Sequence, residues 1–387
     1  MKQKDTRREK GTGNIYQREP GKWVGRLRIG TKADGKAEMK YFSGKTEAEV
    51  KKKIREYNKA SDPSMKEKVT VSDYIDNWLK TYKRDSLKPS SYDRLESTVN
   101  VHIKPSIGDI QLPQLGSDDI QKLLSSLKSN GKSYSTIKKV HDCLNDVLTH
   151  AQIRDDIVKN PMLLVQMPEK KLFEQKQIRV FTETESSAII EECRRVYSTG
   201  RRVYSDYGEV FVLMLNTGIR VGEVTGLKKS DWDQKNKTLH IQRNAQLVRN
   251  RDDDGNVAEG RQLILSSTKT YSGDRVIPLN KAATIALHEL CAAHPESEFV
   301  VCNKDGQNVP AAKIEKAFGR LVKRVGFDGT THSLRHTFAS TLFANGVDVK
   351  TVSQLLGHAS IQITLNTYIH LINKADHEAV TKLDEIF

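Results

Sequence analysis

The first patterned stretch of the chain alternates between apolar and polar residues. After Gly13, apolar side chains recur at about every second position, with Trp23, Leu27 and Ile29 among them. Period-two spacing predicts β-strands, and the Pro-Gly and Asp-Gly pairs in this stretch predict the turns of a three-stranded sheet. The following stretch, KTEAEVKKKIREYNKA, has apolar residues at helical spacing, so one helix is expected to cover the sheet.

Helical spacing takes over after the polar connector SDPSMKEK. Between Val69 and Pro168, apolar residues recur three and four positions apart in about four runs, which predicts a compact helical bundle. We expect Ser72 to be the N-cap of the first helix and the second helix to end before Pro105.

The third segment combines helices with a strand-rich middle. Strands are expected in KTLHIQRNA, RQLILSSTKT and DRVIPLN, and the acidic stretch NRDDDGNVAEG is expected to be a solvent loop without a chemical role. The predicted fold class is therefore multidomain. A small β-sheet plus helix is expected over residues 1–65, an all-α helical domain over 69–168, and a mixed, mainly-α (α+β) domain over 175–387.

Composition excludes several classes of protein. Hydrophobic residues make up 37% of the 387 residues, which favours several small cores. The start MKQKDTRREK is not a signal peptide and no apolar run is long enough to span a bilayer, so we expect a cytoplasmic protein. The cysteines have neither a CxxC pair nor a matching histidine spacing, so they are expected to be ordinary thiols; they are Cys143, Cys193, Cys291 and Cys302.

The charge of the chain points to a polyanionic partner. The net charge is +14. Residues 1–65 contain 18 Lys/Arg and 9 Asp/Glu, so this segment carries +9, whereas residues 69–168 are nearly balanced with 13 against 12. A basic sheet of this size is suited to a DNA major groove, although a small protein-binding module is the alternative. The first ten residues are expected to form a disordered basic tail.

Two arginines stand where an anion could bind. Gly218 is expected to end an apolar helix, after which Arg220 opens a short helix with Glu223 one turn later. His332 and Arg335 stand in the first turn of another predicted helix, whose free N–H groups also attract anions. The simpler alternatives are a surface ion pair for Arg220 and Glu223, and a helix-capping histidine beside a solvated arginine for His332 and Arg335.

A third group follows near the C-terminus. Asp348 is expected to begin a helix that ends at Gly357, which places His358 just after it and Tyr368 on the next helix. A tyrosine at such a position usually fills a core. Together with two arginines and two histidines, however, it suits nucleophilic attack on a phosphodiester without a metal or other cofactor.

The motifs LNTGIRVGE, HSLRHTFAS, LLGHASIQITLNTYIH and the strands around STKTYSGDRVIPL resemble those of the tyrosine recombinases, specifically integrases of temperate phages and conjugative transposons. The resemblance extends over the whole third segment, with all motifs in order. Residues 69–168 resemble the core-type DNA-binding domain of the family, and residues 1–65 its arm-type DNA-binding domain. The chain is therefore expected to be a site-specific recombinase that acts through a Holliday junction.

The resemblance also implies the role of each candidate residue. Tyr368 attacks the phosphate and forms a 3′-phosphotyrosyl link, while Arg220 and Arg335 hold the non-bridging oxygens. His332 is a base or proton shuttle, and His358 donates a hydrogen bond to the phosphate. Glu223 orients an arginine or a histidine, and Lys269 is the general acid for the leaving 5′-oxygen, with Lys228 and Lys229 as nearby alternatives.

Partners follow from the same resemblance. They are double-stranded DNA at core and arm sites, a homotetramer on that DNA, and possible excisionase and host DNA-bending proteins, in the nucleoid of a bacterial host. The tail after Tyr368 is expected to dock on a neighbouring protomer, or else to pack on its own domain. A type IB topoisomerase and a non-cleaving DNA-binding regulator remain alternative functions.

Overall fold

The N-terminal segment forms a three-stranded sheet covered by a helix. In the computed structural model, strands β1 (Asn14–Glu19), β2 (Lys22–Thr31) and β3 (Ala37–Gly44) pair antiparallel in the order β1-β2-β3. Helix α1 (Glu47–Ser61) contacts all three strands, and its Val50 and Ile54 are buried with Leu27. Gly25 allows this close packing, because a Cβ atom there would lie 2.6 Å from the Ile54 Cδ1 atom.

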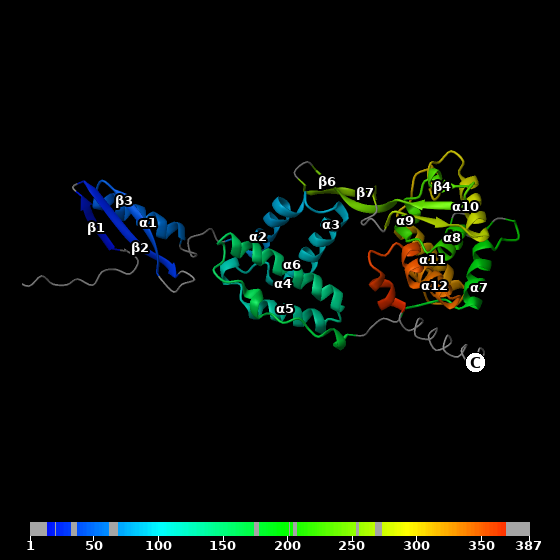
Figure 1. Ribbon diagram of the computed structural model, residues 1–387, viewed down its shortest axis with the longest axis horizontal. Helices are drawn as coiled ribbons and strands as arrows, with labels where there is room; N and C mark the ends of the chain where they lie inside the picture. The colour runs from blue at the N-terminus through cyan, green and yellow to red at the C-terminus, as the bar shows by residue number, and fades with distance from the viewer. Residues whose placement is uncertain are drawn as a thin grey trace, which may run out of the picture. The chain divides into compact units, whose positions relative to one another are not determined.

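The chain divides into two compact units, Met1–Phe173 and Glu174–Phe387 (Figure 1 labels their elements). The structure describes residues 14–19, 21–31, 37–61, 69–173, 178–200, 202–203, 207–252, 255–267 and 273–368. The predicted basic tail, Lys269 and the segment after Tyr368 lie outside these residues.

A helical bundle makes up the rest of the first unit. Its apolar faces meet in one core, in which Ile75, Leu124 and Leu144 are completely buried. The α-helices are α2 (Val71–Trp78), α3 (Pro89–Thr98), α4 (Lys104–Ile107), α5 (Ser117–Ser129) and α6 (Tyr134–Ile153). Wider π turns, Leu79–Lys83 and Val99–Ile103, follow α2 and α3, and short 3-10 turns occupy Leu112–Gln114, Pro161–Leu164 and Lys170–Leu172.

Two predicted helix boundaries in the bundle were wrong. The N-cap of α2 is Thr70, not Ser72, because the extended backbone of Thr70 lets its hydroxyl accept from the Asp73 N–H at 3.1 Å. The second helical run continues past Pro105 instead of ending before it. The π turn ends with the Lys104 N–H bonded to the Val99 carbonyl, so Pro105 stands in a new first turn, where its missing N–H is tolerated.

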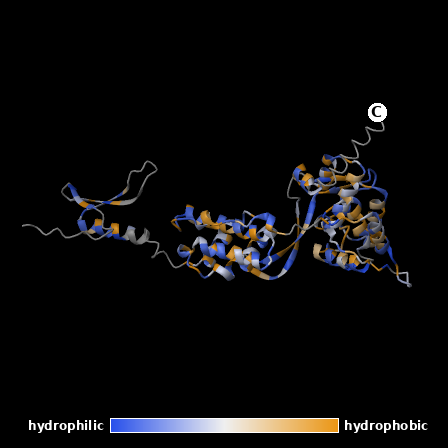
Figure 2. Ribbon diagram, turned by 90° about the horizontal axis from the view of Figure 1, so that it is seen from below, coloured by the Kyte–Doolittle hydropathy of each residue, from blue (hydrophilic) through white to orange (hydrophobic). Residues whose placement is uncertain are grey.

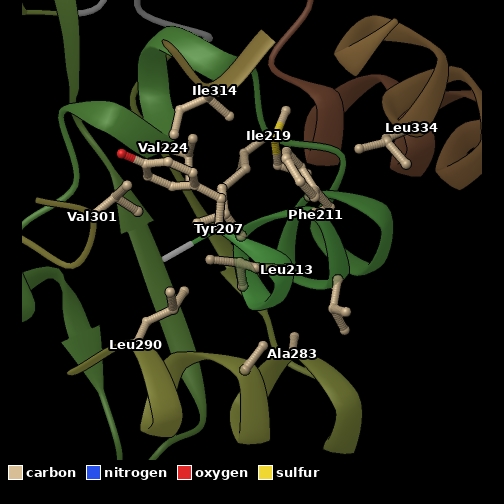
Figure 3. Close-up of a cluster of buried hydrophobic side chains, with 14 of the residues drawn as sticks. Tyr207, Phe211, Leu213, Ile219, Val224, Ala283, Leu290, Val301, Ile314 and Leu334 are labelled. Carbon is tan, nitrogen blue, oxygen red and sulfur yellow. The ribbon is translucent and has the colours of Figure 1, made fainter. Parts of the chain in front are cut away.

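The second unit is built around helix α8 (Gly208–Thr217), which is contacted by α7 (Glu183–Arg194), α10 (Lys281–Ala293) and α12 (Thr331–Ala344). Being surrounded, α8 buries side chains on all sides, most of them apolar, and Phe211 and Leu213 from it lie in the buried cluster of Figure 3. The other helices are α9 (Val221–Thr225), α11 (Ala311–Arg324) and α13 (Val349–Leu356), with a 3-10 turn at Lys229–Asp231. Residues 361–368 are also helical.

The strands of this unit form a small sheet and a separate hairpin. Strands β4 (Trp232–Asp233), β5 (Thr238–Ile241) and β8 (Arg275–Pro278) pair in the order β4-β5-β8. Strands β6 (Arg243–Arg251) and β7 (Val257–Ser267) form the hairpin. Its pairing continues to Arg251 and Val257, so much of the predicted loop NRDDDGNVAEG is strand, and the turn is shorter than expected. Cross-strand hydrogen bonds hold this polar stretch extended although it has no apolar alternation.

Hydrophobic and hydrophilic residues are both found along most helices of the two units (Figure 2), as expected for amphipathic helices that bury one side. Within the described part of the chain, no helix is both long and apolar enough to cross a membrane. The four cysteines are free, and all but Cys291 are buried.

Candidate active site

A left-handed turn at the end of α8 places the first arginine. Gly218 has φ = 63° and ends the helix, and Arg220 is the N-cap of α9. A Cβ atom on Gly218 would lie 2.4 Å from the Phe338 Cδ1 atom, so both the backbone conformation and the packing require glycine here. The prediction that an apolar helix ends at Gly218 and that Arg220 opens the next helix is confirmed.

Arg335 lies buried in the first turns of α12, where only 2% of its surface is exposed. Its Nη1 atom donates to the Gly218 carbonyl at 2.7 Å, and its Nη2 atom donates to the Leu356 carbonyl at 2.6 Å. Burial and the neighbouring Arg220 charge lower the pKa of Arg335 to about 9, so the group is still a cation at pH 7. A guanidinium has five N–H donors, and the two carbonyls leave others for a ligand.

Glu223, predicted to orient an arginine or a histidine, joins two arginines. The Arg220 N–H and Nη1 atoms each donate to its carboxylate at 2.8 Å, and the Arg275 Nη2 atom donates at 2.9 Å. Burial favours the neutral carboxyl, but the hydrogen bonds and charges of Arg275 and Arg220 outweigh it and lower the pKa of Glu223 to about 2. The buried carboxylate therefore remains ionised and positions both guanidiniums.

Arg275 is a site residue that the sequence analysis did not single out. It begins β8, where its side chain is in phase with the buried Ile277. A charged residue on the buried side of a short strand needs a buried partner of opposite charge. The alternation of Arg275 with Ile277 in DRVIPLN was therefore the signal in the sequence that could have identified Arg275.

The C-terminal end of α13 is held by all three arginines. The carbonyls of Leu355, Leu356 and Gly357 accept from Arg275, Arg335 and Arg220, at 2.7, 2.6 and 3.5 Å. The last carbonyls of a helix have no partner within it and carry partial negative charge, so cations are favourable there. Residues from α9, β8, α12 and α13 thus meet at one place. It is cationic because it holds three guanidiniums, of which Arg220 and Arg275 share the carboxylate of Glu223.

His358 follows this helix end, as predicted. Its Nδ1 atom lies 2.7 Å from the hydroxyl of the buried Thr364, in the next helix. Burial and the charges of Arg335 and Arg220 lower the pKa of His358 to about 3, so the ring is neutral at pH 7.

Tyr368 is buried, with 1% of its surface exposed. It packs in a small cluster with Ala339, Phe343 and Val352. Its hydroxyl lies 2.7 Å from the Nδ1 atom of His336, a residue outside the set of candidates predicted from the sequence. Burial raises the pKa of Tyr368 to about 12, although the Arg335 charge acts in the opposite direction.

His332 lies one turn before His336 on α12. It is exposed, and the two imidazole rings meet edge to face with centroids 4.7 Å apart. Burial of part of the ring, with the Arg335 and Arg220 charges, lowers the pKa of His332.

The lysines predicted for this site are either elsewhere or outside the described residues. Lys269 is outside them. Lys228 forms an ion pair with Glu298, with Nζ and Oε2 2.7 Å apart, and Lys229 donates to the carbonyls of His294 and Pro295. Both alternatives to Lys269 are therefore occupied by other groups. Among the residues that the structure describes, no group of three His, Cys, Asp or Glu side chains is arranged to hold a metal ion.

Comparison with known proteins identifies the family. Residues 179–374 match the model of the phage integrase family, and residues 70–128 match the N-terminal SAM-like domain of phage integrases. A tyrosine recombinase XerC-like protein of Caldanaerobacter subterraneus is 30% identical over 93% of this chain and 95% of its own length. The chain belongs to the phage integrase family of tyrosine recombinases. It is a site-specific DNA recombinase, as the sequence predicted, and the topoisomerase and regulator alternatives are not favoured.

Further similarities agree with this family. The transposase of transposon Tn916 from Enterococcus faecalis is 25% identical over 69% of this chain and 66% of its own length. An integrase of transposon Tn1549, solved in complex with a circular intermediate DNA, has a TM-score of 0.66 and 23% identity, covering 81% of this chain and 99% of the solved one. A lambda integrase tetramer bound to a Holliday junction has a TM-score of 0.55 and 18% identity, covering 90% and 96%. These structures confirm the predicted multidomain fold class.

Proposed function

We propose that this recombinase cleaves DNA by attack of Tyr368 on a phosphate held by Arg220 and Arg335. The observation that carries this proposal is the convergence of three arginines on the end of α13, where Leu356 lies in the same buried cluster as Tyr368. A phosphodiester gains negative charge on its non-bridging oxygens as the tyrosine attacks. Guanidiniums fixed before DNA binds stabilise this charge without reorganising.

The remaining groups complete the proposed reaction. The Tyr368 oxygen bonds to phosphorus, the bond to the 5′-oxygen breaks, and a 3′-phosphotyrosyl link and a free 5′-hydroxyl result. Lys269 supplies the proton to that oxygen. His358 hydrogen-bonds the phosphate, His332 acts as a base or proton shuttle, and Glu223 keeps Arg220 in position. Attack by a 5′-hydroxyl of another strand reverses the step and joins the DNA.

The N-terminal sheet is proposed as a second, arm-type DNA contact. One side of the sheet is covered by α1, and the other exposes Tyr16, Arg26 and Tyr41, of which Arg26 and Tyr41 are in register. An exposed arginine beside aromatic rings on a sheet suits the edges of bases in a major groove. The helical bundle, over residues 69–168, is proposed to bind the core site, and residues 175–387 to form the catalytic domain.

The assembly is proposed to be a homotetramer on DNA that integrates or excises a mobile element in the nucleoid of a bacterial host. An excisionase and a host DNA-bending protein are candidate partners. Exchange of the tail after Tyr368 between protomers is the proposed coupling within the tetramer.

A suicide substrate tests the function. We would prepare a nicked duplex that carries one end of the mobile element, with the sequence of that end read from the junction between the element and host DNA. Because of the nick, the cleaved strand loses a short fragment that ends in a 5′-hydroxyl. Wild type is expected to form a covalent protein–DNA complex, also in the presence of a chelator, and Tyr368→Phe none. A complex that persisted in Tyr368→Phe would show that another residue is the nucleophile.

A further inference from the structure

The hydroxyl of Tyr368 is held by a histidine outside the set of residues predicted from the sequence. Within the described ranges, the Nδ1 atom of His336 is its hydrogen-bond partner, at 2.7 Å. The two rings meet edge to face, with centroids 5.7 Å apart, and Phe343 packs on the tyrosine at 5.4 Å. The contact joins α12 to helix 361–368, and the burial of Tyr368 keeps bulk water from replacing it.

We propose that His336 is the catalytic base that takes the proton of Tyr368, an inference that rests on the proposed role of Tyr368 as nucleophile. As the Tyr368 oxygen bonds to phosphorus, its proton moves to the Nδ1 atom of His336. The bond to the 5′-oxygen breaks, and this oxygen takes a proton from the general acid proposed above. On rejoining, His336 returns its proton to the departing tyrosine.

Geometry favours His336 over the other two histidines of the site. A base must lie within hydrogen-bond distance of the proton that it removes, and the distance of 2.7 Å meets this requirement. The Nδ1 atom of His358 lies against the Thr364 hydroxyl instead. His332 meets the ring of His336 edge to face, and among the described residues the tyrosine hydroxyl is hydrogen-bonded to His336 and not to His332.

The surroundings keep His336 ready to accept. It faces His332 and Arg335 on its own helix and Tyr368 on the next, and burial together with His332 and Arg335 lowers its pKa to about 4. The ring is therefore neutral at pH 7, and the tautomer with its proton on Nε2 accepts from the tyrosine. A DNA phosphate bound by Arg220 and Arg335 brings negative charge, which favours the protonated imidazole. The base thus becomes stronger when the substrate is in place.

The test uses His336→Asn in the full chain. The Asn amide oxygen can accept the tyrosine hydrogen bond near the position of Nδ1, but it cannot take the proton. His288→Asn is the matched control, because His288 packs on Trp232 and has no part in the site. Single-turnover cleavage of the nicked duplex is measured with an ordinary 5′-oxygen and with a bridging 5′-sulfur at the scissile phosphate. The sulfur leaves without needing a proton.

We expect His336→Asn to cleave at least about 100-fold more slowly than wild type with both leaving groups, because a positioned base contributes about this much. DNA binding and the melting temperature should match those of His288→Asn. Between about pH 7.5 and 9.5 the wild-type rate should be flat. The variant's rate should rise about tenfold per pH unit, because its tyrosine, with a pKa of about 12, must first ionise.

Three results would overturn the proposal: a wild-type rate in His336→Asn, a slow variant with a flat pH profile, or full recovery with the sulfur leaving group. The second would mean that His336 only positions the tyrosine, and the third that it protonates the leaving oxygen. If His336→Asn does not fold, His336→Ala is used, and added imidazole should restore cleavage; a folded His336→Ala variant without such rescue counts against the base. Absence of a covalent complex in wild type would instead contradict the proposed function.

Discussion

Replacing Arg275 with methionine tests whether the buried charges around Glu223 hold the site together. Arg275 and Glu223 are both nearly inaccessible, with side chains 6% and 5% exposed. Arg275→Met keeps most of the side-chain volume but leaves the carboxylate with Arg220 alone and removes the donor to the Leu355 carbonyl. Removal of one partner of a buried ion pair is strongly destabilising, because the other charge stays buried.

The size of the effect follows from the pKa of Glu223. A value of about 2, against an ordinary 4.5, corresponds to about 3 kcal/mol in favour of the ionised form. Loss of one partner from a buried pair costs about 3–5 kcal/mol. We take about 3 kcal/mol, which for a unit of this size lowers Tm by about 6–12 °C.

Fluorescence of Trp232 follows unfolding of the second unit when the tryptophans of the first, Trp23 and Trp78, are replaced by Phe. Lys228→Met is the control, because Lys228 pairs with a Glu298 side chain that is 60% exposed, and such pairs contribute at most about 1 kcal/mol. A Tm for Arg275→Met within about 2 °C of that control would refute the reasoning. Glu223→Gln combined with Arg275→Met should recover part of the loss, since the buried carboxylate that lost its Arg275 partner is then removed as well.

The same variant has a predicted pH dependence. The pKa of Glu223 is lower in the folded state, so its ionisation stabilises the fold above about pH 4.5, and this contribution is lost as the pH falls towards 2. The difference in the free energy of unfolding between wild type and Arg275→Met should therefore shrink over this interval. A difference that stays constant down to pH 2 would assign the loss to packing.

Two further changes test the turn and the tail. Gly218→Ala should lower the free energy of unfolding by about 1–3 kcal/mol, because a φ of 63° strains alanine and the new methyl group meets Phe338. Gly200→Ala is the control, since Gly200 also has a positive φ but has open space around it. A loss in Gly218→Ala no larger than in this control would exclude the steric contribution of Phe338. Deleting the residues after Asn373 should abolish cleavage by assembled protomers while leaving DNA binding intact, because docking of the tail on a neighbouring protomer is the proposed coupling. A truncated chain that cleaves at the wild-type rate would rule out coupling through the tail.

Local chemistry in the sequence predicted much of the site. The end of α8 at Gly218, the Arg220–Glu223 spacing and the helix from Asp348 to Gly357 all depend on neighbours within a few residues, so they could be predicted. The boundaries that failed, at Ser72 and Pro105, depended on a competing cap and on a π turn, for which apolar periodicity carries no signal.

Only the tertiary structure decided which side chains meet. Arg275 pairs with Glu223 across 52 positions, and His336 holds Tyr368 across 32. Neither contact leaves a periodic pattern, because each results from how separate elements pack: β8 against the end of α13, and helix 361–368 against α12. The sequence by itself therefore determined the candidate nucleophile and two candidate phosphate-binding arginines. The packing determined that Tyr368 is buried, that a third arginine completes the cationic centre, and that the tyrosine hydroxyl lies against His336.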